Sequence, residues 1–438
     1  MSRLPLAVLL MTLMTTTGGR EARAAQAAPL STTEQAIVQA VDARLGDALG
    51  LLERAVNINS GTQNLAGVRE VGALFRAELD RLGFKTTWVD GTPWERAGHL
   101  VAEHPGPGPK VLLIGHLDTV FEPDSPFQKF RRSGTDAHGP GVIDMKGGDT
   151  VMVLALQALK AAGALDGLNV TVVMTGDEEN GGRPLSKARA ALVEAARDTA
   201  AVIGFEDGDG NPKTVVIGRR GTTGWELTVT GTPAHSSQIF KPEVGAGAIF
   251  ETARILEAFR QQLAGKPNLT FNPGVIVGGT AIELDDVESR GTAFGKSNVV
   301  AEHARATGDL RALTPEQFAE ARAVMERIVA ASLPGTKATI TFDEGYPPLA
   351  PTDGNRKLLA MYDQASRDLG FGPVEAVNPD NAGAADVSFV ADPSRMIIDG
   401  VGLMGRDGHT VEETADLSTL PMQAKRAALV LLRLSGAR

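Results

Sequence analysis

Histidine and carboxylate side chains stand at the ends of four short apolar runs in this sequence. The runs are KVLLIGHLD with His116 and Asp118, NVTVVMTGDEE with Glu178 and Glu179, AAVIGFED with Glu206 and Asp207, and RMIIDGVG, which leads to GRDGH and His409. Zinc accepts imidazole and carboxylate ligands, and the chain has no cysteine to supply a thiolate. The four clusters therefore predict a site for divalent metal ions.

The pair His116 and Asp118 indicates how one such ligand is held. Residues two apart on a strand project to the same face, so both side chains can reach one neighbourhood. A ligating imidazole usually donates its other N–H to a carboxylate that fixes its orientation. We therefore expect His116 to bind metal and Asp118 to orient it.

These clusters need a sheet whose strands end at one edge. Continuous β-branched runs are typical of strands that are covered on both faces. Segments with helical spacing, 149–162 and 185–197, lie between the runs, and the helices 33–55 and 68–82 precede them. The alternation predicts an α/β domain with a mostly parallel sheet flanked by helices, in which ligands bind outside the carboxyl ends of the strands.

A different sequence pattern begins near residue 219. Here the predicted strands alternate apolar and polar residues, and they accompany predicted helices at 244–263 and 315–333. Such alternation indicates a sheet with one covered face. We expect a smaller inserted α+β domain, with the Pro- and Gly-rich segment 347–354 leading back to the first domain. The predicted division is a signal peptide at 1–24, catalytic domain at 25–218 and 346–438, and insert at 219–345.

The first 24 residues and the composition predict a location and exclude some partners. Arg3, an apolar stretch at 4–14 and the sequence Ala22-Arg23-Ala24 are typical of a cleavable signal peptide, so we expect a periplasmic or secreted protein. About ten apolar residues are too few to cross a hydrocarbon layer of about 30 Å. The net charge of -10 argues against nucleic acid and anionic membranes as partners.

The order of the motifs resembles a known enzyme family. His116-x-Asp118, Asp144 in GPGVIDMKGG, Glu178-Glu179 in TGDEENGG, Glu206 after VIGF and the late His409 are similar to the dinuclear zinc exopeptidases. This family includes aminoacylase, dipeptidases and the glutamate carboxypeptidases of the carboxypeptidase G type. The resemblance covers nearly the whole mature chain and implies that the insert is a lid or dimerisation domain.

The resemblance implies a metal-ligand set. Asp144 would bridge two zinc ions, His116 and Glu206 would complete one site, and Glu179 and His409 the other. Asp207 competes with Glu206 as ligand, and we favour Glu206. Two histidine ligands argue against calcium, whereas cobalt or manganese could replace zinc.

Glu178 resembles the general base of the family, which takes a proton from the attacking water and gives it to the leaving amine. Asp177 is a weaker competitor for this role.

Residues on the insert and after it resemble the substrate-holding positions of the family. His235 in GTPAHS resembles a histidine that contacts the reacting carbonyl, often in the partner subunit's site, which implies a homodimer. Asn298 and Arg311 resemble residues that hold the substrate, and a guanidinium suits bidentate capture of a carboxylate. Gly383 and Asp386 are further candidates on the substrate side, although Ala384 and Ala385 interrupt the glycine-rich pattern there.

The expected function is zinc-dependent hydrolysis of an amide or peptide bond beside a free carboxylate. The substrate would be a small peptide or an N-acyl amino acid, and a glutamate carboxypeptidase-like enzyme is favoured. Aminopeptidase, dipeptidase and N-acyl amino acid deacylase activities stay open as alternatives. A periplasmic solute-binding protein is the non-enzymatic alternative, and Glu178 argues against it because binding alone needs no base beside a metal.

Overall fold

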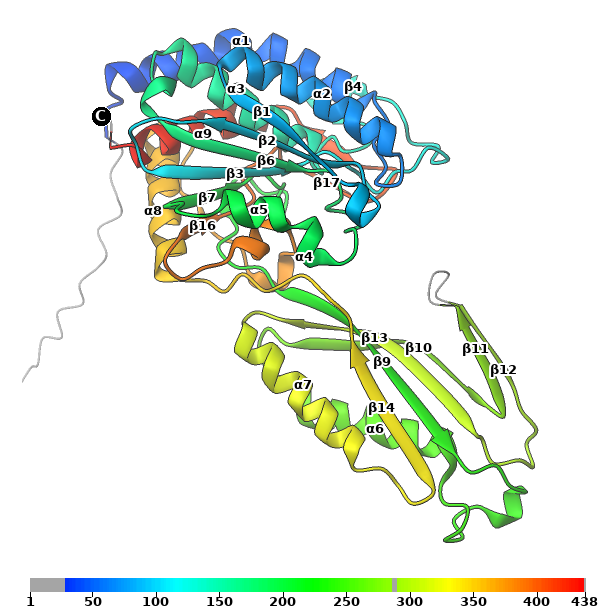
Figure 1. Cartoon of the computed structure of the whole chain (residues 1–438). Coiled ribbons are helices and arrows are strands. Elements are labelled where there is room, and N and C mark those ends of the chain that lie inside the picture. The colour runs from blue at the N-terminus through cyan, green and yellow to red at the C-terminus, as the bar shows by residue number, and fades with distance from the viewer. Residues whose placement is uncertain (1–27, 286–289, 437–438) are drawn as a thin grey trace, which may run out of the picture.

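The computed structural model describes residues 28–285 and 290–436 and shows two bodies joined at a narrow junction (Figure 1). The larger body contains the elements before β9 (Gly221–Gly231) and after β14 (Thr336–Phe342), and the smaller body contains those between. The predicted signal peptide lies outside the described residues. No helix in the described ranges is long and apolar enough to span a bilayer.

The core of the larger body is a six-stranded sheet of order β1-β2-β6-β3-β7-β16. Its strands are β1 (Lys85–Asp90), β2 (Gly98–His104), β3 (Lys110–His116), β6 (Asn169–Thr175), β7 (Ala201–Gly204) and β16 (Met396–Ile398). β6, β3, β7 and β16 pair in parallel, whereas β1 and β2 form an antiparallel edge. The mostly parallel sheet confirms the predicted fold class.

Helices cover both faces of this sheet, as the unbroken apolar runs predicted. α1 (Thr32–Val56), α2 (Leu65–Leu82), α3 (Lys146–Ala161) and α9 (Thr419–Leu434) lie on one face, α4 (Leu185–Ala188) and α5 (Ala190–Ala195) on the other, and α8 (Asp353–Asp368) packs along β16 (Figure 1). In β3, Leu113 belongs to the core under α3, whereas Leu112 and Ile114 pack with Leu192 of α5. The side chains on both faces of β3 are therefore buried, which explains why its sequence does not alternate apolar and polar residues.

Some helix boundaries differ from the prediction, and each difference has a local cause. The segment 185–197 forms two short helices because Arg189, which separates them, adopts φ -99° and ψ 2° and turns a buried guanidinium inward. α6 (Gly247–Leu263) begins after residue 244 because Gly245 and Gly247 have φ of 76° and 75°. Glycine readily adopts this left-handed backbone conformation, which differs from that of an α-helix, so the helix starts only at Gly247.

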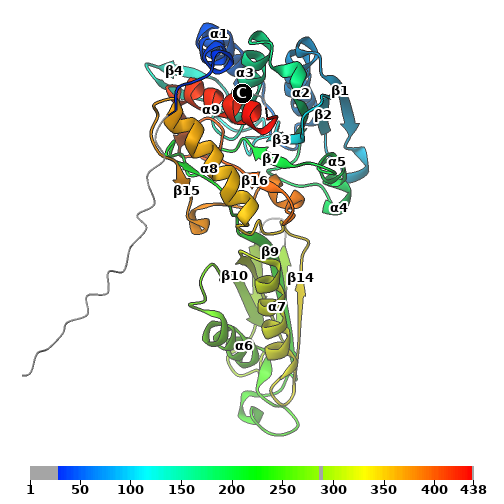
Figure 2. The same cartoon turned by 90° about the vertical axis from the view of Figure 1, so that its left-hand side faces the viewer.

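The smaller body is an antiparallel sheet of order β10-β13-β9-β14 with α6 and α7 (Pro315–Ala330) on one face. Its other strands are β10 (Thr270–Gly279) and β13 (His303–Ala312), and β11 (Ala281–Asp285) pairs with β12 (Arg290–Phe294) as a separate hairpin. Trp225, Leu227 and Val229 of β9 alternate into the core beneath the helices. The insert extends away from the larger body and meets it only at one end (Figure 2).

Candidate metal centre

The predicted metal ligands lie at the carboxyl ends of adjacent parallel strands. His116 is the last residue of β3, Glu179 follows the end of β6, and Glu206 follows the end of β7. Asp144 comes from the loop before α3, and His409 from the loop between β17 (Gly405–Arg406) and β18 (Thr414–Asp416). Parallel pairing brings the three strand ends together, and the two loops fold over them.

Short distances join these five side chains around Asp144. One oxygen of the Asp144 carboxylate lies 2.9 Å from His116 Nε2, and the other lies 2.8 Å from His409 Nε2. His409 Nε2 is also 3.1 Å from Glu179 Oε2, and His116 Nε2 is 3.6 Å from Glu206 Oε1. Asp144 thus stands between two donor pairs, one on each side, which is the arrangement that a bridging carboxylate requires.

The electrostatics of this cluster favour a cation. Donor atoms of His116, Asp144 and Glu179 all lie within 4.8 Å of one another, and Glu179 Oε1 is buried without a hydrogen-bond partner. Burial and the neighbouring Asp144 carboxylate raise the pKa of Glu179 to about 7, and burial raises that of Glu206 well above its ordinary range. A divalent ion would compensate these crowded charges, so the donor set fits the metal that the sequence predicted.

Glu206 is better placed than Asp207 to complete the set. Of the two carboxylates, only that of Glu206 lies within 4.0 Å of His116. The Glu206 N–H donates a hydrogen bond of 3.3 Å to Asp399 Oδ1. Burial and the Asp144 carboxylate raise the pKa of Asp207 to about 7, while the Arg219 guanidinium acts in the opposite sense. The geometry therefore agrees with the preference for Glu206.

Asp118 contacts both His116 and the loop of Glu178 and Glu179, and its contacts differ from those predicted. His116 Nδ1 is 3.0 Å from the Asp118 backbone oxygen and 3.5 Å from its carboxylate. The carboxylate instead accepts hydrogen bonds from the N–H groups of Glu178 and Glu179 at 3.0 and 3.1 Å, and from Thr62 Oγ1 at 2.6 Å. β3 ends at His116, so strand alternation does not govern Asp118. Its carboxylate therefore positions the loop of the proposed base.

The Glu178 carboxylate is available for proton transfer. Among the described residues, none donates a hydrogen bond to this carboxylate or pairs with it, although its backbone is held on both sides. Burial raises the pKa of Glu178 well above its ordinary range, and the nearby carboxylates of Asp386, Glu179 and Asp144 raise it further. Both its freedom and its raised pKa suit a general base.

Asp177 and Asp386 do not take the roles considered for them. The Arg189 guanidinium donates to Asp177 Oδ1 at 2.6 Å and to Asp386 Oδ1 at 2.7 Å, and all three side chains are buried. Thr175 Oγ1 also donates to Asp386 at 2.6 Å. Asp177 is therefore unsuited to act as base, and the Asp386 carboxylate is engaged by Arg189 and Thr175.

Three residues that support the site were missed in the sequence. Arg189 and Tyr346 form a buried bridge, because Arg189 Nη2 donates to the Tyr346 hydroxyl, which donates to the Glu178 carbonyl, both at 2.7 Å. Glu413 accepts hydrogen bonds from the N–H groups of Gly141, Ile143 and Asp144 at 2.9 to 3.3 Å. Tyr346 and Glu413 lie 168 and 269 residues along the chain from Glu178 and Asp144, so no local spacing could have revealed them. Arg189 is only 12 residues beyond Asp177, but no motif marks it.

The insert residues lie at two different ends of β9. Thr222 at the start of β9 pairs with Tyr346 at the junction and with Arg311 of β13, so Arg311 is near the larger body. His235 and Asn298 lie beyond the other end, where Ser236 N donates to the Asn298 carbonyl at 2.9 Å. β9 has 11 residues, and at about 3.3 Å per residue its far end is about 30 Å from the junction.

Gly383 has one clear structural contact. Its carbonyl accepts a hydrogen bond of 2.8 Å from Arg219 Nη1, and Arg219 Nε donates to Asp399 Oδ2 at 2.8 Å. Asp399 also holds the Glu206 backbone. The loop of Gly383 is thus linked to the metal centre through two buried side chains.

Comparison with known proteins identifies the family. Residues 112–433 match the family described as Peptidase family M20/M25/M40. This chain belongs to that family. Carboxypeptidase G2 of Pseudomonas sp. (strain RS-16) is 27% identical over 395 residues, which cover 88% of this chain and 89% of the relative. A succinyl-diaminopimelate desuccinylase of Sphingopyxis alaskensis is 30% identical over 275 residues, covering 59% of this chain and 67% of the relative.

A solved structure supports the architecture. Aminopeptidase PepT from Bacillus cereus superposes with a TM-score of 0.70 at 18% identity, covering 89% of this chain and 98% of the other. The family match over residues 112–433 confirms the predicted resemblance. As a member of the M20 family the protein is a metal-dependent hydrolase of peptide or amide bonds.

Proposed function

We propose that this enzyme is a zinc-dependent exopeptidase that cleaves an amide bond beside a free carboxylate, most closely a glutamate carboxypeptidase. One observation carries the proposal: the Glu178 carboxylate is unpaired among the described residues and adjoins the buried donor set around Asp144. A binding protein would not need an unpaired carboxylate there. Carboxypeptidase G2, similar over most of the chain, supports this choice.

The residues of this chain divide the work of hydrolysis. His116, Asp144 and Glu206 would hold one zinc ion, and Asp144, Glu179 and His409 the other; when bound, the ions activate water and polarise the amide carbonyl. Glu178 takes the proton of the attacking water and later gives it to the leaving nitrogen, a contribution of about 10²- to 10⁴-fold. Asp118 and Tyr346 keep the Glu178 backbone in place by the hydrogen bonds described above.

Arg311 is the proposed partner of the free carboxylate. Its guanidinium lies 3.0 Å from Asp309 Oδ2, and both side chains are more than a third exposed. Exposed ion pairs contribute little to stability, so a substrate carboxylate can displace Asp309 at small cost. An aminopeptidase would instead need an anchor for an ammonium group.

Kinetics on an N-acyl glutamate and its C-terminal amide test this proposal. Wild type should prefer the acid by at least about tenfold, because a charge-assisted hydrogen bond contributes about 1.5 to 3 kcal/mol. Arg311→Ala should lose that preference, and the two losses should not add since each removes the same contact. Equal rates of the wild type on acid and amide would overturn the carboxypeptidase assignment.

We also propose a homodimer that forms through the insert. His235 lies about 30 Å from the junction along β9, which is too far to serve its own metal centre in this arrangement. Large apolar side chains are exposed nearby on the insert: Phe240, Ile249, Phe250, Ile276 and Phe294. The Phe240 and Phe250 rings lie 5.6 Å apart, and exposed apolar side chains that gather in this way support an interface. A partner subunit covering it would bring His235 toward the other chain's site.

A further inference from the structure

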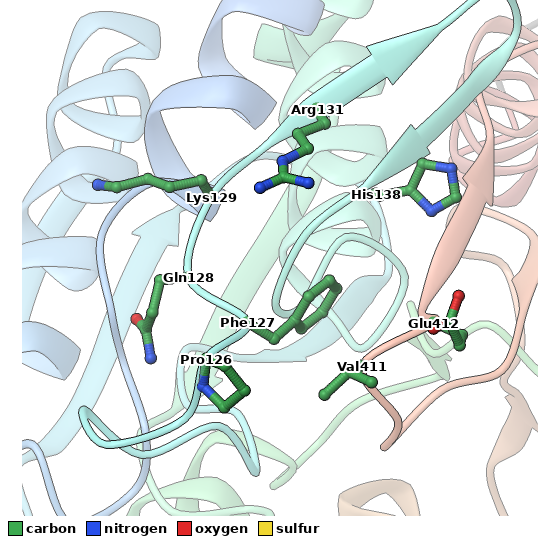
Figure 3. A pocket seen from close by; sticks show the side chains of 8 residues that line it. All are labelled: Pro126, Phe127, Gln128, Lys129, Arg131, His138, Val411 and Glu412. Atoms are coloured by element: carbon green, nitrogen blue, oxygen red, sulfur yellow. The ribbon is translucent and has the colours of Figure 1, made fainter.

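A cavity of about 520 Å³ lies beside the loop that carries His409. Residues before and within the β4 (Arg131–Ser133) and β5 (Asp136–His138) hairpin form one side, and Val411 and Glu412 the other (Figure 3). Val411 is two residues beyond His409, at most about 7 Å along the chain. One wall of the cavity is therefore formed by the loop that carries His409, on the catalytic domain.

Two cations of the lining, Lys129 and Arg131, have no ion-pair or hydrogen-bond partner among the described residues. Among residues 28–285 and 290–436, no carboxylate pairs with the Arg131 guanidinium and no hydrogen bond engages it. His138 uses Nδ1 to contact Thr414 Oγ1 at 2.8 Å, and the Lys129 side chain extends away from the space in Figure 3. Glu412 is the single acid of the lining. An anion in the cavity would meet Arg131 first.

Apolar groups form the rest of the wall. Phe127 packs edge-on against Phe121 with ring centres 5.0 Å apart, which fixes its ring at the rim. Val411 is 52% exposed although it is a large apolar residue. A chain of carbon atoms could cover Phe127 and Val411 and end at Arg131. The lining therefore suits a short apolar chain with an anionic end.

We propose that this cavity binds the acyl part of the substrate and that Arg131 pairs with a carboxylate at the end of that acyl group. The proposal rests on the proposed function, in which Arg311 on the insert takes the carboxylate of the leaving amino acid. The other side of the scissile bond then points to the catalytic domain. Preferred substrates carry a dicarboxylic acyl group.

Substrates that differ only in the charge of the acyl end test this. N-succinyl-L-glutamate ends in a carboxylate, and its succinamyl counterpart ends in a neutral amide of the same size. Wild type should hydrolyse the succinyl compound with a kcat/KM about ten- to a hundredfold higher, as a charge-assisted contact would give. Arg131→Gln should bring that ratio close to one.

Arg132→Gln is the matched control. Arg132 neighbours Arg131 on β4 but projects from the opposite face, and its Nε donates to the Gly134 carbonyl at 3.1 Å. It carries the same charge at almost the same place, so this variant should keep the wild-type ratio. An equal fall in both variants would show a general field effect and overturn the assignment to Arg131.

A series of malonyl, succinyl, glutaryl and adipyl glutamates separates the possible failures. A single optimum length in wild type that disappears in Arg131→Gln supports a fixed anion site in the cavity. Hydrolysis of neutral acyl glutamates with no preference for charge would overturn the cavity proposal and leave the proposed function intact. No hydrolysis of any acyl glutamate by the metal-loaded protein would overturn the proposed function itself.

Discussion

At the scale of single residues, the site depends on how two neighbouring carboxylates are treated. Asp177 is neutralised by Arg189 at 2.6 Å, whereas Glu178 has no such partner among the described residues. The same loop thus presents one carboxylate that holds structure and one that is free to react. The difference is made by Arg189, 12 residues further along the chain.

Glu178→Gln should keep the fold and the metal and lose most of the turnover. The amide preserves the shape of the side chain, but it cannot take up the proton of water, so kcat should fall by about 10²- to 10⁴-fold. Elemental analysis of the variant checks that the metal content matches wild type. A variant of near wild-type rate would exclude Glu178 as base.

At the scale of elements, Tyr346 at the junction between the insert and the larger body is connected to the loop that carries Glu178. Tyr346 follows directly on the insert, pairs with Thr222 of β9, and packs on Phe389 with ring centres 4.8 Å apart. Its hydroxyl reaches the Glu178 carbonyl and accepts from Arg189. The position of the insert and the position of the base are therefore linked by one side chain.

Tyr346→Phe should lower kcat about three- to tenfold with little change in KM, because a lost hydrogen bond of about 1 kcal/mol loosens the Glu178 loop. The other tyrosine of the chain provides the control, since the chain has two. Tyr362 is also buried and donates to Gln423 at 2.9 Å, far from the loop, so Tyr362→Phe should lower Tm without lowering kcat. Identical kinetic effects of both variants would argue against a specific link.

The first helix carries a pH-dependent contribution to stability. Ser31 and Glu34 form a capping box at the start of α1, and Glu34 also pairs with Arg433 of α9 at 2.8 Å. Burial alone would raise the pKa of Glu34, but the hydrogen bonds from Ser31 and Arg433 outweigh it and hold the pKa below 4.5. A carboxylate whose pKa is lower in the folded than in the unfolded state stabilises the fold at pH values above its unfolded pKa. This stabilisation is lost as the pH falls through the folded-state pKa.

Glu34→Gln should therefore reduce the free energy of unfolding by about 1 kcal/mol at neutral pH. The deficit should shrink as the pH falls below about 4.5, because wild-type Glu34 then becomes protonated too. Chemical denaturation at several pH values measures it. Glu53→Gln, on the exposed face of the same helix, is the control and should show no such pH dependence. A deficit that stays constant with pH would assign the effect to packing.

At the scale of the whole molecule, the separation of the two bodies decides what one chain can do. The insert meets the larger body at one end of β9 and extends away from it (Figure 2). Arg311 is at the near end and His235 beyond the far end. For one chain to supply both Arg311 and His235 to its own site, the insert would have to move a long way toward the larger body. In a homodimer, the partner subunit would supply the His235 end of the insert instead.

Mixing His235→Ala chains with Glu178→Gln chains tests the proposed homodimer. Each variant alone should be nearly inactive. After subunit exchange, about a quarter of wild-type activity should return, because about half of the dimers are mixed and each has one complete site. Differently tagged chains confirm that subunits have exchanged. If activity then does not recover, His235 lies outside the partner's site.

The sequence by itself determined the chemistry and the fold class. The ligand types are readable because metal ions accept few side chains, and the continuous apolar runs revealed strands buried on both faces. The set His116, Asp144, Glu179, Glu206 and His409 was implied by the resemblance of the ordered motifs to the dinuclear zinc exopeptidases, and the structure brings these residues together.

Only the tertiary structure decided which nearby acids are free and which are held. Arg189 removes Asp177 and Asp386 from consideration, Glu413 fixes the Asp144 loop from 269 residues away, and Tyr346 reaches Glu178 across 168 residues. These contacts join segments that no periodicity relates, because their partners are chosen by packing and by the cost of burying an unpaired charge. The position of His235 likewise depends on the course of β9 and not on any motif around it.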